Sequence, residues 1–339
     1  MNRRTLLLMT GGFLATGCKT TSGAVAPIAI AVTNPVKWSD AASLPRAKQE
    51  IYPAVHEGEL WLSGGFVAKD GEIVGPTNET VIYNPAENSW RDGPGIPNPR
   101  HHPHLHSHDG KLYAVGGFEP ASADQMWVMQ SGGWRLDADG WNILPDAPEP
   151  IGEAVTASLP TGLHFVGGRK PKASANGTWA DHADTGHHFV LSGETWDTAA
   201  PLPTPRNSAT AEVINGVLYV VGGRTVTGGN STAHEAYDPV SDQWTRLAPL
   251  PQGQGGLASG VINGKLYAFG GEYFDNGGGV YPQCWVYDPQ TDAWDKGPDM
   301  KSPRHGLGGL TLDNRIYAIG GALERGGSQT SALVEVLSA

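Results

Sequence analysis

Short apolar runs that end in a Gly-Gly doublet recur along the chain. The doublets are 52, 51, 55, 48 and 50 residues apart, and they begin at Gly64, Gly116, Gly167, Gly222, Gly270 and Gly320. Short apolar runs between turn signals are typical of buried strands. A sequence period near fifty residues indicates a repeated supersecondary unit. The pattern therefore predicts six copies of one β-rich unit.

Two other features recur at fixed places in the unit. Asn-Gly or Asp-Gly pairs, which favour two-residue hairpins, precede the apolar runs at residues 109–110, 215–216 and 263–264. Aromatic pairs seven residues apart follow the first five doublets, and these are Tyr83/Trp90, Trp134/Trp141, Phe189/Trp196, Tyr237/Trp244 and Tyr287/Trp294. Each unit is thus expected to form four antiparallel strands, which is one blade of a β-propeller.

These features resemble the kelch repeat over essentially all of the chain after residue 36. The resemblance implies an all-β fold, a six-bladed kelch β-propeller at residues 36–339. Only 18 residues follow Gly321, which is enough for one more strand, whereas Trp38 stands in a context like that of Trp244. We therefore predict that the N-terminal strand completes the last blade and closes the ring.

Composition and charge narrow the functional classes. The 339 residues include 47 Gly and 26 Pro, and only 17% are charged, which does not suit a helical bundle or a coiled coil. The formal net charge of −11 argues against nucleic-acid binding through a basic surface. We expect a monomer without a cofactor.

The first residues predict export. Arg3 and Arg4 precede a short apolar stretch, and residues 15–18 (Ala-Thr-Gly-Cys) resemble the lipobox of bacterial lipoproteins. The expected segments are a signal peptide at 1–17 and a tether at 18–35 with a lipid on Cys18. This predicts a periplasmic protein whose membrane contact is its lipid anchor in the outer membrane. Export through the twin-arginine or the general pathway stays open.

Arginines recur at one place in the repeat, in an otherwise acidic chain. Arg100, Arg206 and Arg304 stand sixteen residues before a doublet, and Arg169, Arg224 and Glu272 follow a doublet directly. Because Arg suits carboxylates and other oxyanions, the mouth of the channel is expected to bind an anionic small molecule, a glycan or a protein partner. In the alternative interpretation, each Arg pairs with a neighbouring acid in the scaffold. The predicted ligand-binding residues are Arg46, Arg100, His101, Arg169, Arg206, Asn207, Arg224, Glu272, Arg304 and His305.

Residues 101–108 contain five histidines. Alternation along a strand predicts that His102, His104, His106 and His108 share one face, with Glu50, Glu153 or Glu212 nearby on other blades. Such a set suits a zinc site or acid–base catalysis near neutral pH. In the alternative interpretation the histidines only line a water-filled channel. The catalytic candidates are His102, His104 and Glu153, and no metal is assigned.

The third unit departs from the others, because Ile151 replaces the recurring Arg and the loop 169–188 is the longest. That loop is expected to form one side of the ligand-binding site; in the alternative interpretation it is a long surface loop without a binding role. Two functions follow: a binding propeller, or a sugar mutarotase or epimerase, because the chain is similar in compartment and blade number to the bacterial sialic-acid mutarotase group. A copper enzyme similar to galactose oxidase is disfavoured, because Cys284 is expected on a third strand, away from the channel.

Overall fold

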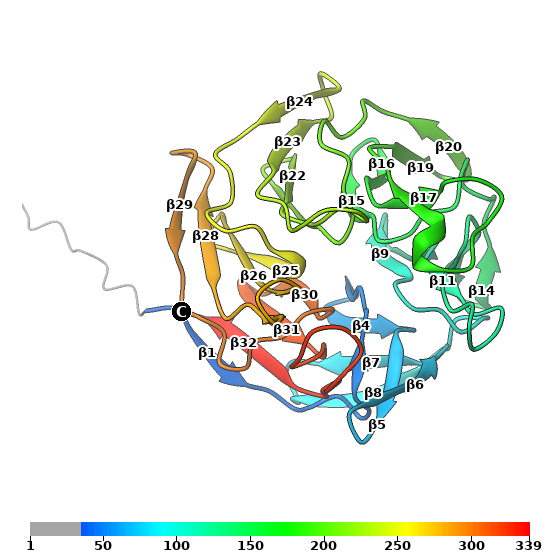
Figure 1. Ribbon diagram of the computed structural model, residues 1–339, viewed down its shortest axis with the longest axis horizontal. Helices are drawn as coiled ribbons and strands as arrows, with labels where there is room; N and C mark the ends of the chain where they lie inside the picture. Colours follow the sequence, from blue (N-terminus) through cyan, green and yellow to red (C-terminus); the bar gives the residue numbers. More distant parts are fainter. Residues whose placement is uncertain (1–34) are drawn as a thin grey trace, which may run out of the picture. The chain divides into compact units, whose positions relative to one another are not determined.

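The computed structural model describes residues 35–339, which form six antiparallel sheets arranged as blades around a central axis (Figure 1). The predicted signal peptide at 1–17, the predicted lipidation site Cys18 and the predicted tether up to residue 34 lie outside the described residues. Within 35–339 the structure is almost entirely strand, with one 3-10 helix at Trp179–Asp181, and no helix there is long and apolar enough to cross a membrane. The predicted all-β, six-bladed propeller is confirmed.

The strands of the first five blades run from the centre of the ring outward in chain order (Figure 1). The first three blades are β3 (Ala54–His56), β4 (Glu59–Ser63), β7 (Thr80–Asn84) and β8 (Ser89–Gly93); β9 (His104–His108), β10 (Lys111–Val115), β13 (Gly133–Asp137) and β14 (Gly140–Ile143); and β15 (Val155–Leu159), β16 (Gly162–Val166), β19 (His188–Ser192) and β20 (Thr195–Thr198). The next two are β21 (Thr210–Ile214), β22 (Val217–Val221), β23 (His234–Asp238) and β24 (Gln243–Arg246); and β25 (Gly255–Ile262), β26 (Lys265–Tyr273), β28 (Cys284–Asp288) and β29 (Ala293–Lys296).

The sixth blade joins the two ends of the described chain. It contains β30 (Gly308–Leu312), β31 (Arg315–Ile319) and β32 (Val334–Ser338), and its outer strand is β1 (Lys37–Asp40). Lys37 pairs with Ser338, and Trp38 Nε1 donates to Pro298 O at 3.0 Å. The N-terminal strand β1 thus takes the place that the fourth strand occupies in the other blades. The predicted ring closure is confirmed.

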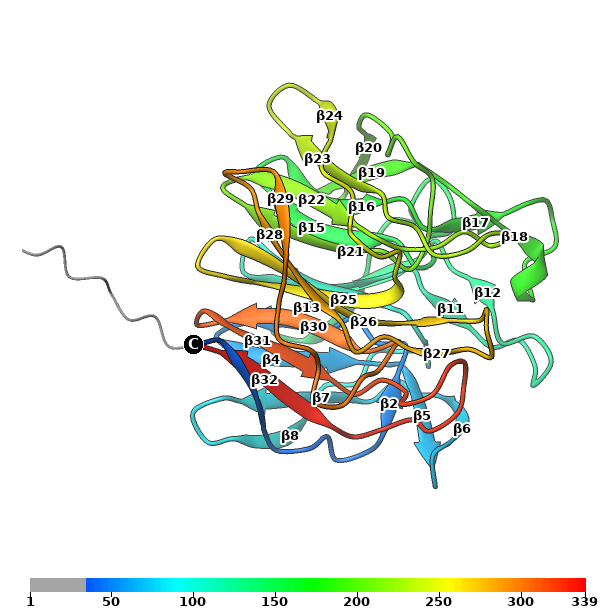
Figure 2. The same cartoon turned by 60° about the vertical axis from the view of Figure 1, so that its left-hand side comes forward.

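The short strands that follow the Gly-Gly doublets gather on one side of the ring, which we call the loop face (Figure 2). They are β5 (Phe66–Lys69) and β6 (Glu72–Pro76) with β2 (Lys48–Gln49), β11 (Phe118–Glu119) with β12 (Val128–Met129), β17 (Arg169–Pro171) with β18 (His182–Asp184), and β27 (Gly279–Val280). The predicted third-blade loop is thus the β17–β18 pair with the 3-10 helix between them.

The doublets let neighbouring blades approach closely. Gly64 has φ +70°, and a Cβ there would lie 2.5 Å from Arg100 O in the next blade. Any side chain at this position would therefore clash with backbone as well as strain φ. On the outer strands, indole groups join the blades, as Trp244 Nε1 donates to Ala200 O at 2.7 Å. The repeated residues therefore hold adjacent blades at a fixed spacing.

Candidate active site at the mouth of the channel

A ring of residues in the left-handed backbone region surrounds the channel at the loop face. Each stands fourteen positions before a doublet, with φ between 50° and 68°, and they are Glu50, His102, Glu153, Ser208, Gly256 and Gly306. Four of the six carry side chains, although this region favours glycine. Non-glycine residues held this way cluster at functional sites, where the surrounding structure supports the strain. The ring is therefore the first candidate for a site.

Backbone hydrogen bonds join neighbouring members of this ring. Glu50 N–H donates to Gly306 O at 2.7 Å, and His102 N–H donates to Glu50 O at 2.9 Å. Where the third blade meets the second, Ala154 N–H donates instead to His104 Nε2 at 3.0 Å, and His104 Nδ1 donates to Val115 O at 3.0 Å. Both nitrogens of His104 thus serve the scaffold, and burial lowers its pKa to about 4. This corrects the expectation that His104 shares a face with His102.

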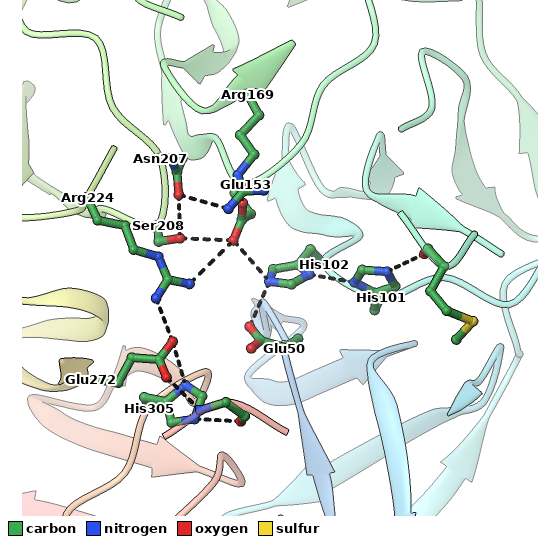
Figure 3. Close-up of polar contacts among 12 residues, drawn as sticks. Glu50, His101, His102, Glu153, Arg169, Asn207, Ser208, Arg224, Glu272 and His305 are labelled. Atoms are coloured by element: carbon green, nitrogen blue, oxygen red, sulfur yellow. Dashed lines mark hydrogen bonds and ion pairs between the residues drawn. The ribbon is translucent and has the colours of Figure 1, made fainter. Parts of the chain in front are cut away.

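His102 lies between two carboxylates. Its Nε2 is 2.7 Å from Glu50 Oε2 and 3.6 Å from Glu153 Oε1, as Figure 3 shows. Its Nδ1 is 2.8 Å from His101 Nδ1, and His101 Nε2 is 2.8 Å from Met126 O. Since a carbonyl oxygen only accepts, His101 donates from Nε2, and as a neutral ring it accepts at Nδ1. His102 then donates from Nδ1 to His101, and its Nε2 faces the Glu50 carboxylate.

The charges around His102 shift the acidity of its neighbours. Burial acts to raise the pKa of Glu50, but the charge and hydrogen bond of His102, helped by His305 and Arg224, outweigh it and lower that pKa. For Glu153, burial is again outweighed, mainly by Arg169, and the pKa is lowered. Both groups are therefore carboxylates at neutral pH. Burial lowers the pKa of His101 well below its usual value, which agrees with a neutral His101.

Two arginines reach the same cluster from the strands and loops after the doublets. Arg169 pairs with Glu153, and its guanidinium lies over the indole of Trp179 from the third-blade loop. Arg224 Nη1 lies 2.5 Å from Glu272 Oε1 and Nη2 lies 4.0 Å from Glu153 Oε1. Arg169 Nη1 and Arg224 Nε have no hydrogen-bond partner within residues 35–339. Arg169 and Arg224 therefore differ from arginines whose guanidinium donors are all hydrogen-bonded.

The remaining mouth residues hold this arrangement. Glu272 Oε2 accepts from Gly326 N–H at 2.7 Å, and His305 Nδ1 lies 3.4 Å from Glu272 Oε1. Asn207 Oδ1 accepts from Ser208 Oγ at 2.8 Å, and Ser208 Oγ also lies 2.9 Å from Glu153 Oε1. The predicted residues that come together are Glu153, His101, His102, Arg169, Asn207, Arg224, Glu272 and His305 (Figure 3).

Arg100, Arg206 and Arg304 turn into the blades instead. Arg206 donates to Gly222 O at 2.6 Å, to Val220 O at 3.1 Å and to Thr204 O at 2.8 Å, and it pairs with Glu235 at 2.5 Å. Arg304 has the same pattern with Glu335, and Arg100 pairs with Glu119 and donates to Gly116 O. Their donors are already used, so the structure supports the scaffold interpretation for these three.

Arg46 also lies apart from the cluster. It is mostly exposed, pairs with Glu79 at 2.7 Å, and lines a separate cavity with Lys48. Its predicted place at the mouth is therefore corrected, because residues 44–46 follow the outer strand of the last blade rather than an inner strand.

Glu50 and Ser208 belong to the site although neither was a leading candidate. The sequence does contain an indication of this position. Gly256 and Gly306 stand at the same distance before their doublets as Glu50 and Ser208, and glycine there indicates a position of positive φ. A Cβ at Gly306 would lie 3.0 Å from the carboxylate of Glu50. Glycine therefore leaves room for the functional side chain across the ring.

Access to the cluster is narrow. A hollow of about 20 Å³ lies beside Glu50, Tyr52, His102 and Ser208. It holds about one water molecule. The side chain of Glu50 is 17% exposed and that of Arg224 is 11% exposed, whereas those of His102 and Glu153 are almost fully buried. A ligand arriving from the loop face therefore meets Glu50 and Arg224 first.

The zinc alternative lacks a ligand set. Residues 35–339 contain no group of three or more His, Cys, Asp or Glu side chains placed to hold a metal ion. Cys284 is buried on β28, the third strand of its blade, and burial raises the pKa of its thiol to about 12. The geometry is therefore that of an acid–base and ion-pair cluster.

Comparison with known proteins agrees with the fold. The model of the KLHDC2/KLHL20/DRC7 kelch-repeats domain matches residues 136–321, more than half of the chain. The chain belongs to the kelch-repeat family. The kelch-like protein terF of Aspergillus terreus is 29% identical over 254 residues, which cover 67% of this chain and 52% of the relative. Mouse kelch-like protein 35 is 32% identical over 208 residues, covering 61% of this chain and 32% of the relative.

The chain thus spans about half, or less, of these curated relatives. The solved structure of YjhT superposes with a TM-score of 0.73 at 18% identity, covering 88% of this chain and 97% of that one. At this identity the likeness concerns the fold alone.

Proposed function

We propose that this kelch propeller is an acid–base catalyst that binds a small carboxylated sugar at the loop-face mouth and interconverts its anomers or epimers. The observation that carries the proposal is the His102 ring held between two carboxylates, with its Nε2 at 2.7 Å from Glu50 and 3.6 Å from Glu153. Charged groups gathered in a strained, buried ring are typical of catalytic sites. The resemblance to the sialic-acid mutarotase group supports the substrate class.

The cluster contains the groups that such a reaction needs. Opening a cyclic hemiacetal removes a proton from the anomeric hydroxyl and delivers one to the ring oxygen as the carbon–oxygen bond breaks; closure reverses both transfers. Glu50 is the partly exposed group that accepts the proton of the anomeric hydroxyl and returns a proton to the ring oxygen. His102, whose two ring nitrogens face His101 and Glu50, orients the Glu50 carboxylate for both transfers. Arg224, whose side chain is 11% exposed, offers its guanidinium to the carboxylate of the substrate.

The direct test is NMR of anomer interconversion for sialic and uronic acids, with and without the protein. Positioned general acid–base groups contribute about 10²–10⁴-fold, so Glu50→Gln and His102→Asn should each lose most of the acceleration. His187→Gln is the matched control, because His187 pairs with Glu149 near the surface. Equal rates for the native protein and Glu50→Gln, or no acceleration at all, would contradict the proposal.

Binding without turnover is the second candidate, and the unpartnered Arg169 Nη1 and Arg224 Nε favour it. The ligand would be an anionic small molecule or glycan. Kelch domains also generally mediate protein interactions, which makes a protein partner the alternative occupant. Calorimetric binding of the same acids without any change in anomer exchange would support the binder over the enzyme.

Export and anchoring are part of the same proposal. The lipobox-like residues 15–18 would place a lipid on Cys18 and hold the propeller in the periplasm at the outer membrane. Mass spectrometry of the membrane fraction should find a lipidated mature N-terminus at residue 18, and Cys18→Ser should release the protein from that fraction. An uncleaved N-terminus in the native protein would overturn this assignment.

A further inference from the structure

A second, larger cavity lies inside the ring and adjoins the hollow at the mouth, with which it shares the lining residues Tyr52, Ala209, Leu257 and Leu307. Its volume is about 270 Å³, and the inner strands of all six blades line it. At roughly 30 Å³ for each water, this is room for about nine waters or for a small organic molecule. Glu50, His102 and Glu153 are not among the lining residues. Its chemistry is therefore independent of the proposed catalytic cluster.

The charge in this cavity comes from one acid. Glu212 on β21 is the only Asp or Glu in the lining, and the lining contains no Lys or Arg. Burial lowers the pKa of His106, on the inner strand β9 two blades away, to about 4, so this imidazole is neutral at pH 7. Burial also raises the pKa of Glu212 to about 7, against the opposing hydrogen bond from Ser259. The Glu212 carboxylate thus has no counter-ion in the cavity.

The hydroxyl groups around Glu212 are oriented toward it. Ser259 Oγ donates to Glu212 Oε1 at 2.8 Å, and Thr210 Oγ1 lies 2.6 Å from Ser259 Oγ. Because Ser259 spends its single proton on the carboxylate, Thr210 must be the donor to Ser259. Thr210 Oγ1, which lines the cavity, thus has lone pairs that can accept a hydrogen bond from a ligand.

We propose that the central cavity is a binding site for a small primary ammonium ion, such as an amino sugar, with Glu212 as its counter-ion. An ammonium group has three donors and no acceptor, which complements a carboxylate surrounded by hydroxyl oxygens. A carboxylate in a buried site without a counter-charge is costly, so a ligand that supplies the charge is favoured. An anionic ligand is disfavoured by the same charge.

The test compares glucosamine with glucose, which differ by an ammonium in place of a hydroxyl. Binding to the native protein is measured by calorimetry at pH 7, and the methyl resonances of Thr156 and Thr311 report occupancy of the cavity. We expect glucosamine to bind at least about tenfold more tightly than glucose, which corresponds to about 1.4 kcal/mol. The methyl shifts should appear with glucosamine and not with glucose at the same concentration.

Variants separate this site from the mouth. Glu212→Gln should remove the preference for glucosamine, whereas Glu79→Gln, a change of an acid outside the cavity, should keep it. His102→Asn should bind glucosamine like the native protein, so failure of the mouth proposal does not affect this one. Thr210→Val keeps the carboxylate and should weaken glucosamine several-fold, which provides a test if Glu212→Gln does not fold. Equal affinity for the two sugars, or an unchanged preference in Glu212→Gln, would overturn the proposal.

Discussion

Arg206 and Arg224 are both buried and both lie 2.5 Å from a glutamate, but their surroundings differ. Around Arg206, three backbone carbonyls and Glu235 accept its protons, and its side chain is fully buried. Arg224 keeps Nε without a partner, is 11% exposed, and lies next to a ring of strained backbone. Arg206 therefore stabilises its own blade, whereas Arg224 is partly exposed and available to a ligand.

This difference shows that residue type and repeat offset are weak guides to function in a propeller. Arg100, Arg206 and Arg304 recur because the blade has carbonyls in the same place each time. In the first blade a lysine, Lys48, stands at the position of these arginines, and its Nζ lies 3.4 Å from Gly64 O. Function is indicated instead by donors left without partners and by side chains at left-handed φ.

The largest effect is expected from Arg206→Lys. Lysine keeps the charge but cannot reach three carbonyls and a carboxylate together, so the free energy of unfolding should fall by about 2–4 kcal/mol. Urea denaturation measures it, and Arg304→Lys should behave alike. Catalysis by the folded fraction should stay at the native level. Unchanged stability in both variants would remove the distinction between the two groups of arginines.

Acid pH should weaken the scaffold through its neutral histidines. Burial lowers the pKa values of His104, His164 and His234 to about 4. The unfolded value is about 6.5, so the unfolded chain binds more protons between these pH values, and stability falls as the pH drops. Stability is therefore highest above about pH 6.5 and is lost progressively as the pH falls toward about 4.

Urea denaturation at pH 7.5 and pH 4.5 checks this loss. His234→Gln should have a smaller difference between the two pH values than the native protein, whereas the surface control His187→Gln should keep the native difference. Equal stability at both pH values in the native protein would show that these histidines are not held neutral.

Arg224→Lys should affect ligand handling more than folding. The charge that balances Glu272 remains, while the planar group that faces the substrate carboxylate is lost, so KM for a carboxylated sugar should rise about tenfold, near 1.4 kcal/mol. The melting temperature should stay within about 2 °C of the native value, in contrast to Arg206→Lys. A fall in melting temperature equal to that of Arg206→Lys, with unchanged KM, would place Arg224 in the scaffold.

The smallest effect comes from a matched pair of glycines. Gly256→Ala and Gly306→Ala both place a side chain at positive φ, which should cost about 1 kcal/mol of stability each. Only at Gly306 would the new Cβ meet the Glu50 carboxylate, at 3.0 Å, whereas at Gly256 nothing lies nearer than 3.8 Å. Anomer exchange should therefore fall for Gly306→Ala alone. Equal losses in both variants would mean that Glu50 is not at the reacting centre.

The candidate site was only partly predictable from the sequence. His101, His102, Glu153, Arg169 and Arg224 were found because they break the repeat at positions facing one mouth. Strand alternation failed at His102, because its φ of 51° turns it out of the strand, which begins at His104. The sequence indicates Glu50 only as an accessory acid. Its position fourteen residues before a doublet does not show which side chains of other blades lie next to it.

The sequence by itself determined the repeating blade, the number of blades and the closure of the ring. These follow from local chemistry, since Gly-Gly doublets admit close backbone approach and pairs such as Asn215–Gly216, with φ of 53° and 80°, form tight hairpins. Only the tertiary structure decided which arginines stay available to a ligand and which acids share His102. The scaffold arginines Arg206 and Arg304 are held by carbonyls and a glutamate of their own blades, up to 31 residues away in the chain. The two carboxylates beside His102 come instead from the neighbouring blades, about fifty residues away.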